Sequence, residues 1–229
     1  MSLAPLLLIP PALWALYTWG GHVLTLGAIR HGPGARRRLA LTFDDGPDPV
    51  HTPKVLDLLR SMGAHATFFL VGERAVRVPE LVRRIVEEGH ELGNHTWSHR
   101  NLWACGPRQT VAEIVEGHRV LERAAGSAPR WFRPPWGMVN LAVFRATRRL
   151  GTPCVFWSLQ PEGLRPVPPA RQTRYVLARA HPGAIVDLHD APGVQGAPER
   201  LLAALPSMIS GLRARGYELV SLGTLLSGA

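Results

Sequence analysis

The chain has 229 residues and a mass of 25.1 kDa, the size of one large domain or of one ordinary domain with an appendage. Its 46% hydrophobic composition is enough for a real core, which excludes the disordered, collagen-like and disulfide-scaffold classes. The formal charge is +9, from 26 basic and 17 acidic residues, and because Lys54 is the only lysine, nearly all of the positive charge is guanidinium, which favours phosphate or carboxylate partners.

The first 29 residues contain no Asp, Glu, Lys or Arg, but they include Trp14, Tyr17 and Trp19. A hydrocarbon core of about 30 Å needs about 20 apolar residues in a helix, and prolines suit a first helical turn. Residues 12–29 are therefore predicted to form a slightly short membrane span. An in-plane apolar segment, a cleaved signal and a helix packed on the domain remain alternatives, although the basic start and small-residue cleavage site of a secretory signal are not clear here.

Residues 30–38 form a basic linker that contains Arg30 and the run Arg36, Arg37 and Arg38. Basic residues near a span tend to stay on the cytoplasmic side, which would place the main domain inside. The alternative is a solvated linker whose arginines contact lipid headgroups on either face of the membrane. The predicted localisation is thus the membrane, with the side of the main domain left open.

Residues 39–229 alternate short apolar runs with amphipathic stretches, the pattern of strands joined by helices in an α/β domain. One helix is expected to open with Thr52 as its N-cap and Pro53 as its first residue. About seven strand and helix units are enough for a closed or nearly closed parallel barrel of the (β/α)7 type, with an open sheet as the alternative. The expected strands span 39–43, 66–71, 91–94, 131–133, 153–157, 184–188 and 217–222, and the expected helices span 52–63, 79–88, 110–125, 140–150, 171–180 and 198–215.

Polar side chains follow four of the expected strands, at the point where each strand ends. Because the carboxyl ends of parallel strands meet at one edge of a sheet, this clustering favours a functional site over core filling. The residues are Asp44 and Asp45 after the first strand, His95 and His99 after the third, Arg133 after the fourth and His189 after the sixth.

His95 and His99 are four residues apart, so in a helical turn both imidazoles would reach one ion. Asp44 and Asp45 are adjacent on an extended segment, so one carboxylate can bind the metal while the other receives a proton from water. Each pair has a structural alternative, since Asp-Asp-Gly-Pro is also a turn sequence and His95 is a possible helix cap. Together, two imidazoles and one carboxylate form the three-ligand site typical of catalytic zinc, although cobalt, nickel or iron would fit the same ligands.

The chain resembles the polysaccharide deacetylases of carbohydrate esterase family four, the NodB-homology group. The resemblance covers residues 39–222 and rests on motifs in family order: Thr-Phe-Asp-Asp-Gly-Pro at 42–47, His-Thr-Trp-Ser-His at 95–99, Arg-Pro-Pro-Trp-Gly at 133–137 and Leu-His at 188–189. It implies a distorted (β/α) barrel and a divalent metal held by Asp45, His95 and His99. It also implies hydrolysis of an N-acetyl group on an amino sugar.

The resemblance further assigns roles to individual residues. Asp44 would be the general base, Arg133 would hold that carboxylate ionised and oriented, and His189 would donate a proton to the departing amine. The backbone N–H of Trp136 would stabilise the oxyanion. The substrate site would include Pro134, Trp136 and Leu188. From the residues alone, Trp97, Trp136 and Trp157 are expected to be core or pocket wall rather than sugar-stacking residues.

One family feature is missing from the sequence. The family usually carries an Asp-Trp pair after the fifth strand, whose aspartate tunes the acid histidine, whereas this chain has Gly163 and Leu164 there. Glu162 is a possible substitute for that aspartate, although the side chain of an adjacent residue normally points elsewhere. A carboxylate raises the pKa of a neighbouring imidazolium, so without it the activity is expected to decline at a lower alkaline pH than in relatives. Gly163→Asp would then extend the active range to higher pH.

The function predicted from the sequence is a membrane-associated, metal-dependent hydrolase. Its substrate would be an N-acetylated glycan of a wall polymer, a chito-oligosaccharide or a lipid-linked glycan. The alternative is a membrane-tethered glycan-binding protein of the same fold with little or no turnover. Nucleic-acid binding is not expected, because the arginines form no basic stripe interleaved with aromatic residues. The sequence does not specify the sugar, the native ion or the oligomeric state.

Overall fold

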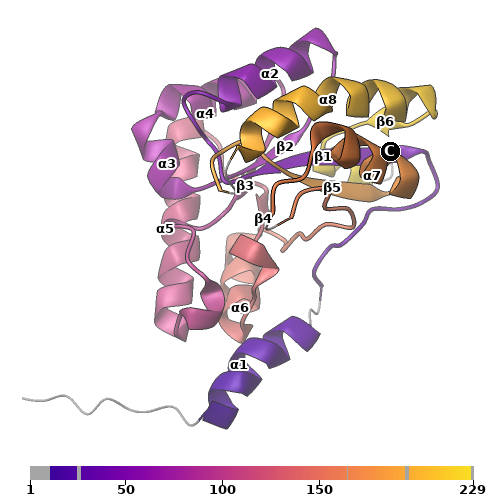
Figure 1. The fold of residues 1–229 in the computed structure, drawn as a ribbon. Helices are drawn as coiled ribbons and strands as arrows, with labels where there is room; N and C mark the ends of the chain where they lie inside the picture. Colours follow the sequence, from indigo (N-terminus) through magenta and orange to yellow (C-terminus); the bar gives the residue numbers. More distant parts are fainter. Residues whose placement is uncertain (1–10, 25–26, 164, 194–195, 228–229) are drawn as a thin grey trace, which may run out of the picture.

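The computed structural model describes residues 11–24, 27–163, 165–193 and 196–227. Its centre is a six-stranded parallel sheet with the order β4-β3-β2-β1-β5, and β6 pairs with β1 beyond this path (Figure 1). The strands are β1 (Arg38–Asp44), β2 (Thr67–Leu70), β3 (Glu91–Asn94), β4 (Trp131–Phe132), β5 (Ala184–His189) and β6 (Glu218–Leu219).

Helices cover the outer face of the sheet, and long helices follow β1, β3 and β5 in the expected alternation (Figure 1). Their bounds are α2 (Thr52–Ser61), α3 (Gly72–Arg77), α4 (Pro79–Glu87), α5 (Pro107–Ala125), α6 (Leu141–Leu150), α7 (Pro169–Arg179), α8 (Ala197–Ala214) and α9 (Leu222–Ser227), with 3-10 turns η1 (Leu102–Ala104) and η2 (Pro135–Gly137). The short helices α3 and α9 were not expected, and α9 takes the end of the predicted last strand.

The predicted N-cap of α2 is wrong. The cap position is His51, and Thr52 lies inside the helix. The hydroxyl of Thr52 instead donates a hydrogen bond to the buried carboxylate of Asp190, 138 residues away along the chain. A tertiary partner therefore takes the hydroxyl that sequence reasoning assigned to a local cap.

The seven-unit barrel is also wrong in one segment, because residues 153–157 form no regular strand. Two single bridges join this segment to the rest, from Cys154 to Phe132 and from Val155 to Ile29. Pro153 has no N–H to donate to a neighbouring strand, although its carbonyl accepts a hydrogen bond from the N–H of Phe132 at 3.0 Å. The parallel sheet therefore curls into an incomplete barrel, whose last gap is bridged by loop segments.

The side chains of β1 alternate between two environments. Leu39, Leu41 and Phe43 are fully buried against the covering helices, in the main core cluster. Ala40 points to the concave side, together with Ile185 of β5. Strand alternation thus also directs Thr42 and Asp44 to the concave side, where the chemistry lies.

The N-terminal helix α1 (Pro11–Leu24) packs beside α6 at the end of the molecule opposite α2 and α8 (Figure 1). Among the described residues, no helix is both long enough and apolar enough to cross a bilayer. The predicted span over 12–29 is therefore not observed: α1 ends at Leu24, residues 25–26 lie outside the described part, and Ile29 donates its N–H to the carbonyl of Cys154 at 2.9 Å. Outside the core, Leu13, Leu16 and Trp19 are exposed.

Candidate active site

Three predicted metal ligands meet at the carboxyl ends of β1 and β3. Asp45 follows β1, and His95 and His99 follow β3. Nε2 of His99 lies 2.9 Å and Nε2 of His95 lies 3.5 Å from Oδ1 of Asp45. The ligand atoms of the three side chains all lie within 4.8 Å of one another. This spacing brings all three donors within reach of one cation.

The chemistry of these donors fits a divalent ion. Oδ1 of Asp45 is buried and accepts no hydrogen bond from the described residues, so it has a lone pair to give. Nδ1 of His95 lies 2.7 Å from the carbonyl of Arg133, which fixes the ring and leaves Nε2 free for a metal. Burial is the largest influence on the pKa of Asp45 and would raise it, but His95 and His99 hold that pKa well below its usual value. The carboxylate is therefore ionised and ready to bind a cation.

The two histidines reach the same point by a different route from the one predicted. Residues 95–99 form a loop and not a helical turn, so the helical-spacing argument was wrong. Thr96 and His99 have φ angles of 70° and 56°, in the left-handed region. Side-chain hydrogen bonds hold this loop, because Oδ1 of Asn94 accepts from the N–H of Thr96 at 2.9 Å and Oγ1 of Thr96 accepts from the N–H of His99 at 3.0 Å.

Backbone strain is concentrated around this site. Among the described non-glycine residues, those with positive φ are Asp45, Thr96, His99 and Trp136, and all four belong to the metal-ligand motifs or the Arg-Pro-Pro-Trp-Gly motif. Such conformations cost roughly 1–3 kcal/mol each and persist where the surrounding structure fixes them. The φ of 73° at Asp45 also corrects the expectation of an extended Asp44–Asp45 segment, because both carboxylates lie near Nε2 of His95, at 3.8 and 3.5 Å.

Arg133 holds Asp44 in place from β4. Its NH1 donates to Oδ1 of Asp44 at 2.7 Å and to Oγ1 of Thr42 at 2.8 Å, and its NH2 donates to the carbonyl of Phe156 at 3.0 Å. Arg133 is fully buried, with its guanidinium 4.1 Å from the ring centroid of Phe69. The other oxygen of Asp44 faces the metal ligands, 3.8 Å from Nε2 of His95. One oxygen is thus anchored while the other is directed at the site.

Glu162 supplies the carboxylate that the sequence comparison found missing. Its Oε2 lies 2.7 Å from Nδ1 of His189. Burial, the largest influence, lowers the pKa of His189, but Asp187 and Glu162 outweigh it and raise that pKa well above the usual value. The premise of an unpartnered His189 is therefore wrong, and with it the reason for expecting Gly163→Asp to extend the alkaline range. The carboxylate thus comes from Glu162, the residue before Gly163, because the loop turns the Glu162 side chain toward His189.

Asp187 was missed by sequence reasoning and lies between the predicted base and the predicted acid. Its carboxyl accepts from NH1 of Arg133 at 3.3 Å and from Nε2 of Gln160 at 3.1 Å. Burial is the main reason that the pKa of Asp187 rises to about 7, and the negative charge of Asp44 adds to it. An aspartate in the middle of an otherwise apolar strand was the signal that could have identified it.

Leu188 and Pro134 do not come to the site with the other predicted residues. Leu188 is fully buried and packs in the core between sheet and helices, because neighbouring side chains along β5 point to opposite faces and His189 takes the inner one. Pro134 is also buried. Neither side chain is among those that line the cleft described below, in which the predicted substrate residue Trp136 does take part.

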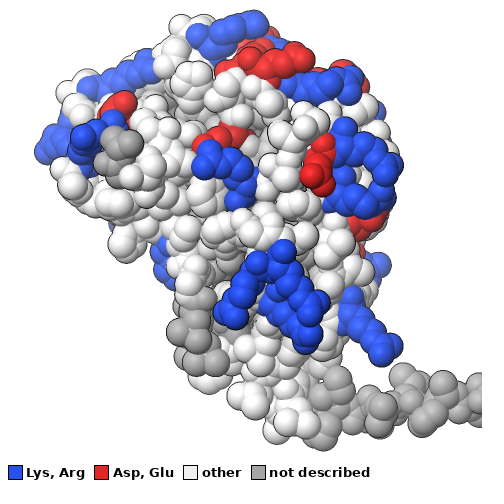
Figure 2. All heavy atoms as spheres, turned by 180° about the vertical axis from the view of Figure 1, so that it is seen from behind, with Lys and Arg blue, Asp and Glu red and all other residues white. Residues whose placement is uncertain are grey.

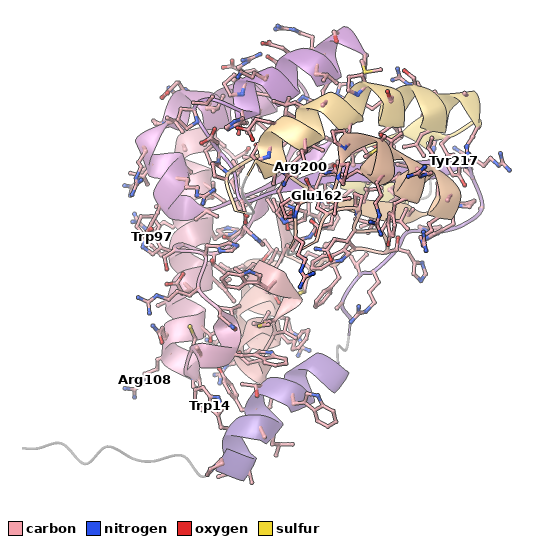
Figure 3. All side chains as sticks on the ribbon, viewed as in Figure 1. Trp14, Trp97, Arg108, Glu162, Arg200 and Tyr217 are labelled. Carbon is pink, nitrogen blue, oxygen red and sulfur yellow. The ribbon has the colours of Figure 1, made fainter. Side chains whose placement is uncertain are left out.

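A cleft of about 630 Å³ opens over the predicted ligands Asp45 and His99 and over His189. Trp136 and Trp157 line it, as expected for pocket-wall residues, and the ring of Trp136 meets that of His99 edge-on at 4.4 Å. The side chain of Trp136 is 53% exposed, so its ring forms an open rim of the cleft. Trp97 lies along α5, away from Glu162 and Arg200, which are at the cleft (Figure 3).

Comparisons with known proteins agree on one family. Residues 31–155 match the family model described as polysaccharide deacetylase. A peptidoglycan-N-acetylglucosamine deacetylase of Bacillus cereus is 37% identical over 85% of this chain and 90% of its own length. A chitooligosaccharide deacetylase of Bradyrhizobium sp. is also 37% identical, over 86% of this chain and 95% of its own.

Solved structures give the same result. A peptidoglycan N-acetylglucosamine deacetylase crystallised with a hydroxamate-type benzamide superimposes with a TM-score of 0.84 at 35% identity, covering 90% of this chain and 96% of that one. A family-four pseudoenzyme of Bacillus anthracis has a TM-score of 0.79 at 25% identity, covering 86% and 68% of the two chains. The chain belongs to the polysaccharide deacetylases of carbohydrate esterase family four.

Proposed function

We propose that this protein is a metal-dependent hydrolase that removes the N-acetyl group from an amino sugar of a glycan and releases acetate. One observation carries the proposal: a buried carboxylate and two imidazoles converge with an unpartnered Asp45 oxygen between them, and Asp44 stands 3.8 Å from Nε2 of His95. The names of the relatives, which act on peptidoglycan N-acetylglucosamine or on chitooligosaccharides, support an N-acetylglucosamine-containing substrate.

Asp45, His95 and His99 would hold the ion, with zinc as the default and cobalt, nickel or iron as chemically suitable replacements. When bound, the ion makes water more acidic and polarises the acetyl carbonyl. The unanchored oxygen of Asp44 accepts a proton from the attacking water, while the hydrogen bond from Arg133 orients this carboxylate.

The acid step falls to His189. As the water oxygen bonds to the acetyl carbon and the carbon–nitrogen bond breaks, His189 gives its proton to the departing amine nitrogen. The N–H at Nδ1 of His189 is hydrogen-bonded to Oε2 of Glu162 at 2.7 Å, so Nε2 is the nitrogen that donates the proton to the amine. The backbone N–H of Trp136 is proposed as a donor to the oxyanion.

A non-catalytic glycan-binding role is the second candidate. It is favoured by one structural neighbour of the same fold, which is described as a pseudoenzyme. The coexistence of Asp44, Arg133 and His189 around one cleft favours turnover instead, because binding alone does not require a base, an orienting cation and an acid together.

Acetate release from N-acetylglucosamine oligomers and peptidoglycan fragments tests the proposed function. Zinc-loaded protein should remove acetyl groups, seen as loss of one acetyl mass, and Asp44→Asn should lower kcat by at least about 100-fold because the general base is lost. Asp57→Asn, an exposed carboxylate on α2, is the matched control and should keep its rate. Tight glycan binding by wild-type protein without any acetate would support the pseudoenzyme alternative.

We also propose that α1 attaches the chain to a membrane surface, lying in its plane. Leu13, Leu16 and Trp19 are 56%, 62% and 65% exposed on this helix. The adjacent helix α6 carries exposed Arg145, Arg148 and Arg149, and no acidic residue occurs between Glu122 and Glu162. Figure 2 shows basic side chains above this end of the molecule without acidic ones among them. An apolar helix face beside arginines that form no ion pair with any described residue suits an anionic lipid surface.

Vesicle sedimentation tests this attachment. The chain should bind phosphatidylglycerol vesicles more tightly than phosphatidylcholine vesicles, and serine at both Leu13 and Leu16 should weaken binding to both by about tenfold or more. Val76→Ser removes an equally exposed apolar side chain, 55% exposed, from α3 and should change nothing. Equal recovery of wild type and the double variant with vesicles would contradict the proposal.

A further inference from the structure

The cleft over the metal ligands is lined by more positive charge than the proposed chemistry uses. Arg74, Arg165 and Arg200 line the same cleft as Asp45 and His189. The lining contains two carboxylates, and each lies against imidazoles and not against an arginine: Asp45 faces His95 and His99, and Glu162 contacts His189. The surplus guanidinium groups are therefore not neutralised by acidic residues of the cleft wall.

None of these three arginines forms an ion pair with a described residue, but Arg74 has a backbone acceptor. Its NH1 donates to the backbone carbonyl of Asp45 at 2.8 Å and so braces the metal loop. Arg165 is exposed at the cleft. Arg200 lies in the first turn of α8, and its Nε is buried without a hydrogen-bond acceptor.

The acidic neighbour of Arg200 is occupied elsewhere. Oε1 of Glu199 lies 3.1 Å from Nε2 of His51, and Glu199 is therefore tied to the loop before α2. Arg200, from α8, and Glu162, from the loop before α7, line the same cleft (Figure 3). Since Glu162 contacts His189, the cleft that holds the proposed acid also contains the guanidinium of Arg200.

The cleft continues past Arg165 into a second depression of about 600 Å³. The two hollows share Gln160, Glu162, Gly163, Arg165 and Val167, and the second adds Arg171 and Tyr175. The second hollow offers space beside the site where the acetylated sugar would react. Arg165 and Arg171 line this second hollow, where a substituent of a neighbouring sugar would lie.

Building on the proposed function, we propose that the cleft selects N-acetylated glycans whose neighbouring sugar carries a carboxylate, which Arg165 and Arg200 bind. A guanidinium fork matches a carboxylate in two parallel hydrogen bonds, and such charge-assisted bonds are stronger than neutral ones. A chito-oligosaccharide is neutral and offers these arginines only hydroxyl and amide groups. A glycan with free lactyl ether carboxylates, as on a muramic acid from which the stem peptide has been removed, supplies the missing anion.

Two tetrasaccharides of equal length provide the test. One is the neutral N-acetylglucosamine tetramer, and in the other alternate sugars carry lactyl ethers with free carboxylates. The ratio of kcat/KM, anionic over neutral, should exceed about 10 for the wild-type protein and fall toward about 1 in Arg165→Gln/Arg200→Gln. The ratio should also fall with added salt in the wild type, because exposed charge pairs are screened. Arg83→Gln/Arg123→Gln removes two exposed arginines from α4 and α5, outside both hollows, and should keep the wild-type ratio.

Binding to protein that carries Asp44→Asn separates this inference from the proposed function. In that background the anionic tetrasaccharide should bind at least about tenfold more tightly than the neutral one, and the added Arg165→Gln/Arg200→Gln pair should remove the difference. If neither glycan is deacetylated but this binding preference is present, the proposed function fails and the selectivity stands. Equal affinities for both glycans, or a preference that survives the arginine substitutions, would overturn the inference.

Discussion

At the residue scale, His189 depends on carboxylates from two separate segments. Glu162 contacts its Nδ1 directly, and Asp187 lies two residues before it in β5 on the same concave face. Both raise the pKa of His189 against the opposing effect of burial. The protonated imidazole that the acid step requires is therefore present below this raised pKa and is lost as pH rises through it.

Removing the charge of Glu162 should narrow the alkaline range of activity. Glu162→Gln keeps an acceptor for Nδ1 but no negative charge, so the pKa of His189 falls and the alkaline limb of kcat moves about one pH unit lower or more. A pH profile of kcat with saturating metal measures this shift. Glu116→Gln, which removes an exposed carboxylate on α5, should leave the limb in place. An unshifted limb in Glu162→Gln would mean that this carboxylate does not tune the acid.

At the element scale, Asn140 fastens α6 to α5 and to η1. Its Oδ1 accepts from the N–H of Ala142 at 3.1 Å and caps α6 as predicted. Its Nδ2 also donates to the carbonyl of Leu102 at 2.6 Å and to Oγ1 of Thr110 at 2.9 Å. Asn140 follows the segment 133–139, which includes the cleft residues Trp136 and Met138. Its hydrogen bonds therefore fix the end of one wall of the cleft.

Truncating this side chain should destabilise the fold markedly. Asn140→Ala loses a helix cap and removes the amide that donates to the buried hydroxyl of Thr110 and to the carbonyl of Leu102, so the free energy of unfolding should fall by about 2–4 kcal/mol. Urea unfolding followed by circular dichroism measures the change. Asn101→Ala removes the partly exposed cap of the three-residue turn η1 and should cost about 1 kcal/mol. A smaller loss for Asn140→Ala than for Asn101→Ala would contradict this account.

At the scale of the whole molecule, the ligands join loops that follow two separate strands of the sheet. Asp45 and His95 are 50 positions apart in the sequence, so the unfolded chain does not hold them together. Metal binding is thereby coupled to the folded state, and a bound ion stabilises that state by mass action.

Metal removal should therefore lower the melting temperature. Zinc at about 100 times its Kd should add about 2.7 kcal/mol relative to chelated protein, and at this chain length that corresponds to about 5–10 °C. Differential scanning calorimetry measures the difference. His99→Ala should lose most of it, whereas His181→Ala, far from the ligands in sequence and bonded to Ser158, should retain it. Equal melting temperatures with and without zinc would rule out a metal at these ligands.

The order of elements and the positions of the chemistry-bearing residues were predictable from the sequence. Hydrophobic periodicity located five of the seven expected strands closely. Burial of a strand selects apolar residues in a local pattern that does not depend on which strands it pairs with. Asp44, Asp45, His95, Arg133 and His189 could be grouped in advance, because parallel strands end at one edge of the sheet.

Only the tertiary structure decided how these pieces meet. Residues 153–157 pair with β4 at one point and with Ile29 at another, so the barrel stays incomplete. Leu188 turned outward and Asp187 inward, because the partner strands set the facing of β5, and the loop before α7 brought Glu162 to His189. The sequence by itself determined which groups gather at the sheet edge, through local patterns of burial. Their orientation was settled by contacts between segments far apart in the chain, which no local pattern records.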